Sequence, residues 1–177
     1  MTVDGCCLMT NHIDLIATPE AEESLAKALE RKHFGYTKYV NRFHKRSGHL
    51  WQNRFYSCAL DDEHYWTAMP YVEQNPDRAR LTRRPWRYRW SSAASYCGLA
   101  KDRTELLDLD AWDEGISGED WEATLREMLD EQLLSTVRPN MHRGHPLGSD
   151  SFSSKIEALV GRRLRPFPVG RPRKRQK

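Results

Sequence analysis

The sequence has no apolar run of about 18 residues, so no segment is expected to span a membrane. Its first residues, MTVDGCCLM, have neither a basic start nor a long apolar stretch, and a signal peptide is therefore not expected. None of the four cysteines belongs to a C-x-x-C pair (Cys6, Cys7, Cys58 and Cys97). This spacing suits neither a zinc site nor a disulfide framework, and it predicts reduced thiols in a cytoplasmic protein.

Acidic residues are missing from the end of the chain, where residues 161–177 contain eight Lys or Arg and no Asp or Glu. Residues 27–89 contain fourteen Lys or Arg against six Asp or Glu, whereas residues 101–131 contain three against twelve. A net charge of only +3 conceals this segregation. Any one block also fits a solvated face, but two basic blocks, one of them rich in aromatics, make nucleic acid the leading partner class.

Residues 5–17 predict two short strands joined by a turn at Thr10-Asn11. Polar and apolar residues alternate in the second strand, which puts His12 and Asp14 on one face. Thr18-Pro19 is a favourable helix start, and the helix that follows is expected to end near residues 41–45. Residues 51–60 (WQNRFYSCAL) predict a further strand.

A second helix is expected to start at Asp61 with acidic residues in its first turn and to be stopped by Pro76. Its apolar stripe comprises Tyr65, Trp66, Met69 and Val72. Tyr71 and Asn75 fall within about 40° of each other around the helix and away from the centre of that stripe, so Tyr71 is not an obvious core residue. Pro70 is expected to kink the helix.

The C-terminal part predicts two more helices. An acidic amphipathic helix is expected over residues 121–133, and a last helix is capped by Ser149 or Asp150 and ended by Gly161. The tail after Gly161 has no periodicity and is expected to be flexible.

His12, Asp14, Tyr71 and Asn75 together form a candidate site. Imidazole, carboxylate and an amide oxygen suit Mg²⁺ or Mn²⁺, which would polarise a phosphodiester. A tyrosine beside such a metal can attack phosphorus and keep the bond energy as a phosphotyrosine link. Each feature alone also has a structural interpretation: a surface His-x-Asp, a packing tyrosine, and an asparagine at a helix end.

Several segments carry a resemblance to one family. They are CCLMTNHIDLIATP, SGHLWQNRFYSCALDDEHYWTAMPYVEQNPDRARL followed by RYRWSSAASYCG, and, near the end, HRGHPLG and GRRLRPFPVGRPRK. Together they resemble the REP-associated tyrosine transposases, HUH-type enzymes in whose metal-binding strand two histidines flank one hydrophobic residue. The resemblance covers nearly the whole chain.

The resemblance implies a role for each residue of the candidate site. Tyr71, in YVEQNP, matches the family nucleophile, which forms a 5′-phosphotyrosine link and frees a 3′-hydroxyl. His12 matches the first histidine ligand, and Asp14 stands where the second histidine is expected. Asn75 matches the third ligand of the Mg²⁺ or Mn²⁺ ion, with Gln74 as a less favoured substitute. An aspartate in the second position would favour Mg²⁺ over softer metals.

The fold implied is α+β, a ferredoxin-like palm with an antiparallel sheet and helices on one face, followed by a C-terminal helical extension and a basic tail. Accordingly we expect a catalytic domain over residues 1–98, an acidic linker and helical extension over 99–160, and a flexible basic tail over 161–177. The family normally has a further strand and helix before the metal-binding strand, so the palm is expected to be incomplete at its N-terminus, with an exposed sheet edge.

Two surfaces are candidates for DNA binding. The first interleaves cations with aromatics and comprises Arg42, Lys45, Arg46, His49, Trp51 and Arg54. Lys and Arg neutralise phosphates while aromatic rings stack on unpaired bases, although Trp51 also fits a core position. The second surface, in the tail, comprises Arg171, Arg173 and Lys174. It resembles an AT-hook that enters the minor groove, and a nonspecific basic tail is the alternative.

These features predict a transposase-type enzyme that nicks single-stranded or hairpin DNA of repeated palindromic elements. It would act as a monomer or homodimer in the cytoplasm of a bacterium, in association with the nucleoid. The alternative is a catalytically inactive hairpin-DNA-binding remnant of such a transposase. A metal-independent RNA-binding module is a third, less favoured interpretation.

Overall fold

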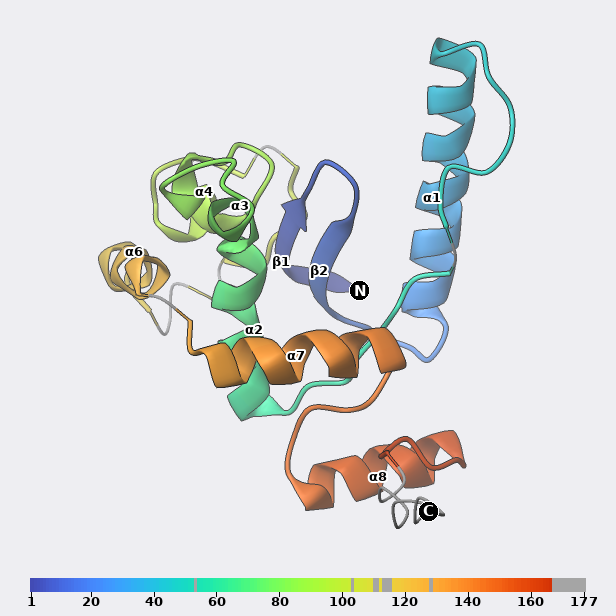
Figure 1. Cartoon of the computed structure of the whole chain (residues 1–177), viewed down its shortest axis with the longest axis vertical. Helices are drawn as coiled ribbons and strands as arrows, with labels where there is room; N and C mark the ends of the chain where they lie inside the picture. Colours follow the sequence, from blue (N-terminus) through green and yellow to red (C-terminus); the bar gives the residue numbers. More distant parts are fainter. Residues whose placement is uncertain (53, 103, 110–111, 113–115, 128, 167–177) are drawn as a thin grey trace, which may run out of the picture.

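The computed structural model describes residues 1–52, 54–102, 104–109, 112, 116–127 and 129–166. Within these residues the protein is α+β, with a two-stranded antiparallel sheet and several helices around it (Figure 1). The elements, in chain order, are β1 (Thr2–Leu8), β2 (Ile13–Thr18), α1 (Ser24–Phe43), α2 (Asp62–Glu73), α3 (Asn75–Arg78), η1 (Pro85–Arg87), α4 (Ala93–Tyr96), α6 (Gly118–Arg126), α7 (Glu131–Arg143) and α8 (Asp150–Val160).

The predicted strand pair is confirmed, and its register sets the candidate site. Cys7 of β1 lies opposite Asp14 of β2, and the turn is closed by a hydrogen bond from the Met9 amide to the His12 carbonyl at 2.9 Å. The register shifts between Val3 and Gly5. A side chain at Gly5 would lie 2.8 Å from the Met69 sulfur, so glycine allows α2 to approach the sheet closely.

Helix α2 packs across the strand pair and starts where the sequence indicates. Asp61 is its N-cap, and its side chain accepts a hydrogen bond from the His64 amide at 3.0 Å. Pro70 lies inside the helix, which continues to Glu73. The expectation that Pro76 stops this helix is wrong, because α2 ends three residues earlier and Pro76 lies in the first turn of α3, where a missing N–H costs nothing.

The core forms where the end of α2 meets the sheet, α4 and α6. All residues from Ala68 to Glu73 are buried. The carboxylate of Glu73 is fully buried and accepts hydrogen bonds from the Ser92 hydroxyl and, at 2.8 Å, from the Trp121 indole N–H of α6. Burial raises the pKa of Glu73 to about 7 in spite of these two donors.

Three predicted elements differ in the structure. Thr18 ends β2, and its hydroxyl donates to Asp4 at 2.7 Å, so α1 begins six residues later, at Ser24. The strand expected over residues 51–60 is absent among those described, where only Leu60 forms an isolated bridge, to Leu147. The acidic helix is broken, since α6 ends at Arg126 and α7 begins at Glu131.

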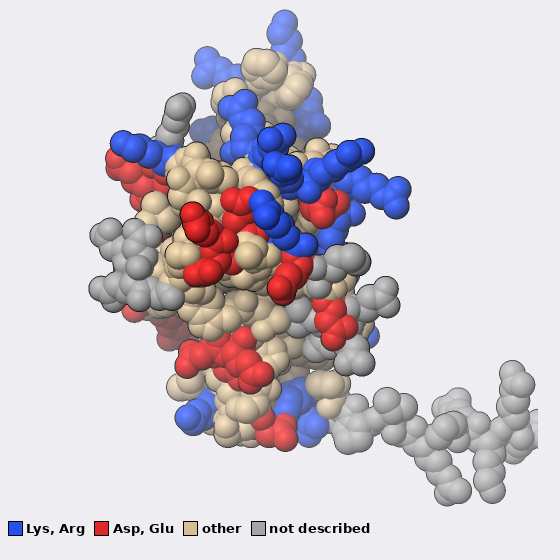
Figure 2. All heavy atoms as spheres, turned by 90° about the vertical axis from the view of Figure 1, so that its left-hand side faces the viewer, with Lys and Arg blue, Asp and Glu red and all other residues tan. Residues whose placement is uncertain are grey.

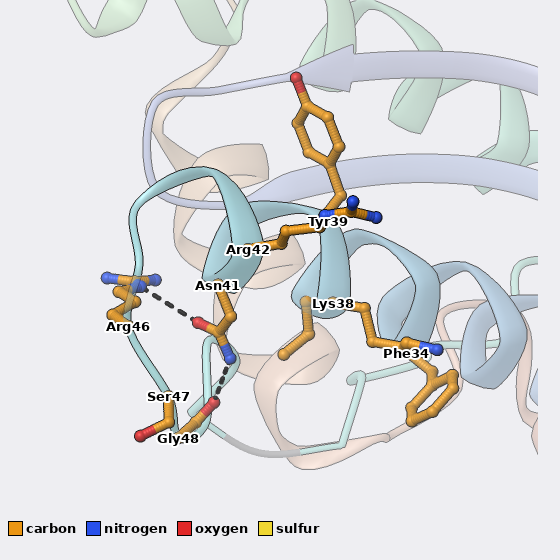
Figure 3. A pocket seen from close by; sticks show the side chains of 9 residues that line it. Phe34, Lys38, Tyr39, Asn41, Arg42, Arg46, Ser47 and Gly48 are labelled. Carbon is orange, nitrogen blue, oxygen red and sulfur yellow. Dashed lines mark hydrogen bonds between the residues drawn. The ribbon is translucent and has the colours of Figure 1, made fainter.

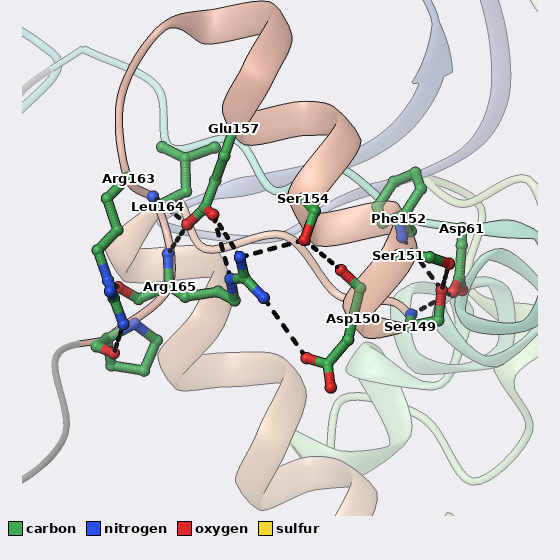
Figure 4. A network of polar contacts seen from close by, with 11 residues as sticks. Asp61, Ser149, Asp150, Ser151, Phe152, Ser154, Glu157, Arg163, Leu164 and Arg165 are labelled. Carbon is green, nitrogen blue, oxygen red and sulfur yellow. Dashed lines mark hydrogen bonds and ion pairs between the residues drawn. The ribbon is translucent and has the colours of Figure 1, made fainter.

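The last helix, α8, has the predicted ends. Ser149 caps it by accepting a hydrogen bond from the Phe152 amide, and Gly161 follows it with a left-handed φ of 67°. Beyond the helix the chain turns back, and the Arg165 guanidinium contacts Glu157 at 2.7 Å and Ser154 at 3.2 Å (Figure 4). These contacts fasten the last described residues to α8.

Charge is segregated on the folded surface as it is along the chain. On the face of the molecule that carries α6, Lys and Arg gather over the upper part, Asp and Glu lie below them, and further Lys and Arg lie at the bottom (Figure 2). None of the described helices has the length and apolar character required to cross a membrane. All four cysteines are free, as the sequence predicts.

Candidate functional site

The turn of the β-hairpin presents two of the predicted ligands. His12 immediately precedes β2, and Asp14 is the second residue of that strand. The His12 side chain is 46% exposed and that of Asp14 only 10%. The two side chains meet, with His12 Nε2 lying 3.4 Å from Asp14 Oδ2.

The third predicted ligand, Asn75, is the first residue of α3, and its side chain reaches those of His12 and Asp14. Its Nδ2 lies 3.1 Å from His12 Nε2 and donates a hydrogen bond to Asp14 Oδ2. These contacts join positions 63 and 61 residues apart in the sequence. The fold therefore brings the three predicted metal ligands together.

Asn11 was missed as a site residue, although it lies next to His12. Its Oδ1 is 2.7 Å from His12 Nδ1, so the imidazole donates from Nδ1. In the neutral imidazole this bond leaves the lone pair on Nε2, the atom that faces Asn75 and Asp14. A second hydrogen bond of this kind is what orients a metal-binding histidine. In the sequence, Thr10-Asn11 indicated only a turn.

The three side chains lie close enough together to be compared with the ligands of a small divalent cation. Neighbouring ligands of an octahedral Mg²⁺ lie about 3 Å apart, given metal–oxygen distances of about 2.1 Å. The separations from His12 Nε2, 3.1 Å to Asn75 Nδ2 and 3.4 Å to Asp14 Oδ2, are close to that value, whereas Asn75 Nδ2 and Asp14 Oδ2 lie closer together, joined by a hydrogen bond. Asn75 now presents its amide nitrogen, and turning the amide over would present its oxygen without moving the backbone.

A set of three metal ligands at this point requires the side-chain amide of Asn75. No group of three His, Cys, Asp or Glu side chains able to hold a metal occurs within the described part of the chain. Gln74, the substitute ligand, does not face the site, because its Nε2 donates to the carbonyls of Leu125 at 3.2 Å and Glu127 at 2.8 Å. Asn75 is thus the amide available to His12 and Asp14.

Cys7 lies opposite Asp14 and is not a further ligand in its resting state. Its side chain is completely buried. Burial and, secondarily, the nearby Asp14 carboxylate raise the pKa of the Cys7 thiol to about 12. It is therefore a neutral thiol at physiological pH, and a metal ligand would need the thiolate.

Tyr71 lies in the core, contrary to expectation, with only 4% of its surface exposed. The apolar face of α2 widens over its last turns, because the sheet covers one side and other elements cover the rest. The hydroxyl of Tyr71 has no hydrogen bond to any described residue. The single apolar stripe of α2 does not reveal this burial, because such a stripe marks the face that packs against one neighbouring element.

Arg78 covers the Tyr71 ring. Its guanidinium carbon lies 4.4 Å from the ring centroid, and Nη2 donates to the Tyr71 carbonyl at 2.7 Å. The Nε and Nη1 atoms of Arg78 are buried and have no hydrogen-bond partner among the described residues. Burial lowers the pKa of this guanidinium, and the nearby Tyr71 and Asp14 partly oppose that effect. Sequence reasoning missed Arg78, which was counted only as one of many cations.

The predicted DNA-binding residues lie elsewhere, around the end of α1 and the segment that follows it. Arg42, Lys45, Arg46, His49 and Arg54 are all exposed. Trp51 is half-buried, because its ring stacks on His33 at 4.1 Å and its indole N–H donates to the His33 carbonyl. Arg171, Arg173 and Lys174 lie outside the described residues.

Comparison with known proteins finds no matching family model, no matching curated protein and no matching solved structure.

Proposed function

We propose that this protein cuts and rejoins single-stranded DNA through attack of the Tyr71 hydroxyl on a phosphodiester, assisted by Mg²⁺ or Mn²⁺. The observation that carries the proposal is the convergence of His12, Asp14 and Asn75 at separations of 3.1 and 3.4 Å from His12 Nε2. The resemblance of these residues and of YVEQNP to the tyrosine transposases supplies the reaction type.

The ligand set suits the ion that such chemistry requires. His12 Nε2, an Asp14 oxygen and the Asn75 amide oxygen would hold it, and Asn11 would keep the imidazole in the ligating tautomer. When bound, the ion would polarise the phosphodiester and stabilise charge on the leaving oxygen.

The bond changes balance within the DNA and the protein. A bond forms between the Tyr71 oxygen and phosphorus, and the bond from phosphorus to the 3′-oxygen breaks. The phenol gives up its proton and the 3′-oxygen gains one, so no other reactant is consumed. The reverse attack by a 3′-hydroxyl rejoins the strand.

Tyr71 must first be uncovered for this reaction, because Arg78 lies on its ring. A DNA phosphate offers acceptors to the two guanidinium nitrogens that have no partner among the described residues. We therefore include in the proposal that DNA draws Arg78 away from the ring and that the guanidinium then holds the phosphate beside Tyr71.

The partner in this proposal is single-stranded or hairpin DNA, bound through Arg42, Lys45, Arg46 and their neighbours. The ferredoxin-like palm belongs to the proposal as well. Its support is the antiparallel pair β1–β2 with α2 packed across it. A cytoplasmic, nucleoid-associated location would follow from a DNA partner.

A second candidate function is hairpin-DNA binding without cleavage, as expected of an inactive remnant. The burial of Tyr71 favours it, since a nucleophile that is 4% exposed cannot meet phosphorus without rearrangement. The aspartate in place of the second histidine also favours it.

One experiment separates the two functions. The full chain is incubated with Mn²⁺ and a labelled hairpin oligonucleotide that carries a single-stranded flank, and covalent adducts are detected on a denaturing gel. We expect an adduct in the wild type that is lost in Tyr71→Phe and kept in Tyr36→Phe, which removes an exposed hydroxyl. Binding without an adduct at any metal concentration would overturn the enzyme and leave the binding protein.

A further inference from the structure

Helix α1 is built unlike the other long helices. It has 20 residues and none of them is buried. A helix on the surface of a globular protein ordinarily buries an apolar stripe. Figure 1 shows α1 standing beside the rest of the fold, with the chain after it running back along its length. We call α1 with residues 44–52 the α1 arm.

Large rings on this helix face solvent. Phe34 is 66% exposed, Tyr39 64% and Phe43 71%. Tyr39 and Phe43 pair with each other, their ring centroids 6.2 Å apart. Large exposed apolar groups concentrated on one element mark surfaces that bind something. Trp51 is not one of these rings, since it holds the returning segment against α1 by stacking on His33.

The same surface is strongly basic. From residue 24 to residue 46 the chain has seven Lys or Arg and a single acidic residue, Glu30. Phe34, Lys38 and Arg42 follow one another at intervals of four residues and so share a helix face. The Lys38 ammonium lies 5.3 Å from the centroid of the Phe34 ring. Around the helix, Lys38 and Arg42 therefore lie between Phe34 on one side of the arm and Tyr39 and Phe43 on the other.

This face borders an open hollow of about 590 Å³ (Figure 3). Across the hollow, Asn41 fixes the turn that follows the helix. Its Nδ2 donates to the Gly48 carbonyl at 2.9 Å, and its Oδ1 accepts from Arg46 Nε at 3.2 Å. Gly48 has a φ of 103°, which only glycine adopts without strain. The turn thus holds Arg46 beside the hollow.

We propose that the α1 arm is a stacking surface for unpaired bases of the single-stranded DNA that the protein acts on. Exposed rings accept base faces, and the cations between them meet the phosphates. A membrane-bound helix would instead separate its cations from its rings on opposite faces. An acidic protein segment would satisfy the cations but leave the rings without planar partners. The inference rests on the proposed function for the identity of the strand.

The test measures binding of the full chain to a labelled single-stranded oligonucleotide by fluorescence anisotropy over a range of salt. One variant combines Phe34→Ala, Tyr39→Ala and Phe43→Ala, and a second combines Arg42→Gln and Arg46→Gln. Trp90→Ala is the matched control, because Trp90 is 51% exposed and also lies beside an arginine, Arg89. No residue of α1 is buried, so the variants should keep the wild-type circular dichroism.

The two variants should fail in different ways. Loss of the rings should weaken binding about ten-fold or more while leaving the salt dependence unchanged, because stacking is uncharged. Loss of two arginines should reduce the slope of log affinity against log salt by about 1.4, at about 0.7 per phosphate contact on a single strand. A 2-aminopurine base in the oligonucleotide should be quenched by the wild type and not by the ring variant. Binding to a blunt duplex should be unaffected by loss of the rings.

The inference is overturned if the ring variant binds the single strand as tightly as the wild type. It is also overturned if single-strand and duplex binding weaken equally, or if the rings prove to hold two copies together, as seen by a smaller mass in sedimentation with unchanged DNA affinity. Its failure is distinguishable from that of the proposed function. If the Tyr71 adduct forms but loss of the rings leaves DNA binding unchanged, only the stacking role of the α1 arm is rejected. If binding depends on the rings but no adduct forms, only the proposed enzyme activity is rejected.

Discussion

The guanidinium carbon of Arg78 lies over the ring of Tyr71, 4.4 Å from its centroid, and Nη2 also donates to the carbonyl of that same residue. The cation that covers the proposed nucleophile is therefore anchored to the nucleophile's own backbone. It carries two buried nitrogens without partners among the described residues, an arrangement that stability alone does not favour.

Replacing Arg78 by methionine should separate stability from function. The variant loses a cation–π contact and a hydrogen bond, but it also removes two unpaired buried nitrogens. We expect these effects to offset each other to within about 1 kcal/mol in the free energy of unfolding, measured with urea. Adduct formation should fall by about ten-fold or more. The exposed Arg83→Met is the control, and an unchanged adduct yield in Arg78→Met would remove Arg78 from the mechanism.

Manganese should stabilise the folded protein if the three ligands bind it. At a concentration about 100 times Kd, a ligand of the native state adds about 2.7 kcal/mol, which raises Tm by about 5–10 °C in a chain of this size. Asp14→Asn should abolish most of this shift, and the exposed Asp62→Asn should keep it. Equal shifts in both variants would show that the metal binds elsewhere.

Glu73 should make stability depend on pH. Its pKa is raised to about 7 from an ordinary value of 4.5, so the folded state holds its proton more tightly than the unfolded state. Stability from this group is greatest below pH 4.5 and falls as the pH rises to about 7, by an amount on the order of 3 kcal/mol. Glu73→Gln should flatten that fall and be more stable at pH 8, since Gln can accept from Trp121 and donate to Ser92. Unfolding by urea at pH 5, 6, 7 and 8 measures the slope, and Glu119→Gln, at an exposed position, should keep the wild-type slope.

Glu157 should control the turn after α8. Hydrogen bonds from Arg165, and from the amides of Leu164 and Arg165 at 2.8 and 2.9 Å, lower the pKa of Glu157 to about 2. Its contribution is present above pH 4.5 and is lost as the pH falls toward 2. Glu157→Gln should speed hydrogen exchange at those two amides, measured by mass spectrometry. Lys155→Gln, at an exposed position two residues away on the same helix, should not, and equal exchange in the two variants would contradict the role of Glu157.

Local rules were sufficient where one segment determines its own structure. The β-hairpin, the Asp61 cap and the Ser149 and Gly161 ends of α8 follow from turn and cap chemistry, which the sequence shows directly. The proximity of His12 and Asp14 follows from strand periodicity in the same way.

Features that depend on contacts with residues far away in the sequence could not be predicted from local sequence patterns. Residues 51–60 have strand-like composition, but those of them that the structure describes form no strand, and Trp51 packs on α1. Tyr71 is buried by elements that a helical wheel of α2 does not include. Arg78, seven residues after Tyr71, covers its ring from the end of α3.

The α1 arm occupies much of the chain between the two halves of the candidate site, since Asp14 and Asn75 are 61 residues apart. The entropy lost on closing such a loop grows only with the logarithm of its length, by about 0.6 kcal/mol per doubling. No residue of α1 contributes to the core. Insertions or deletions in the arm should therefore cost the fold little, and this segment can lengthen, shorten or change its contacts in evolution while His12, Asp14 and Asn75 still meet.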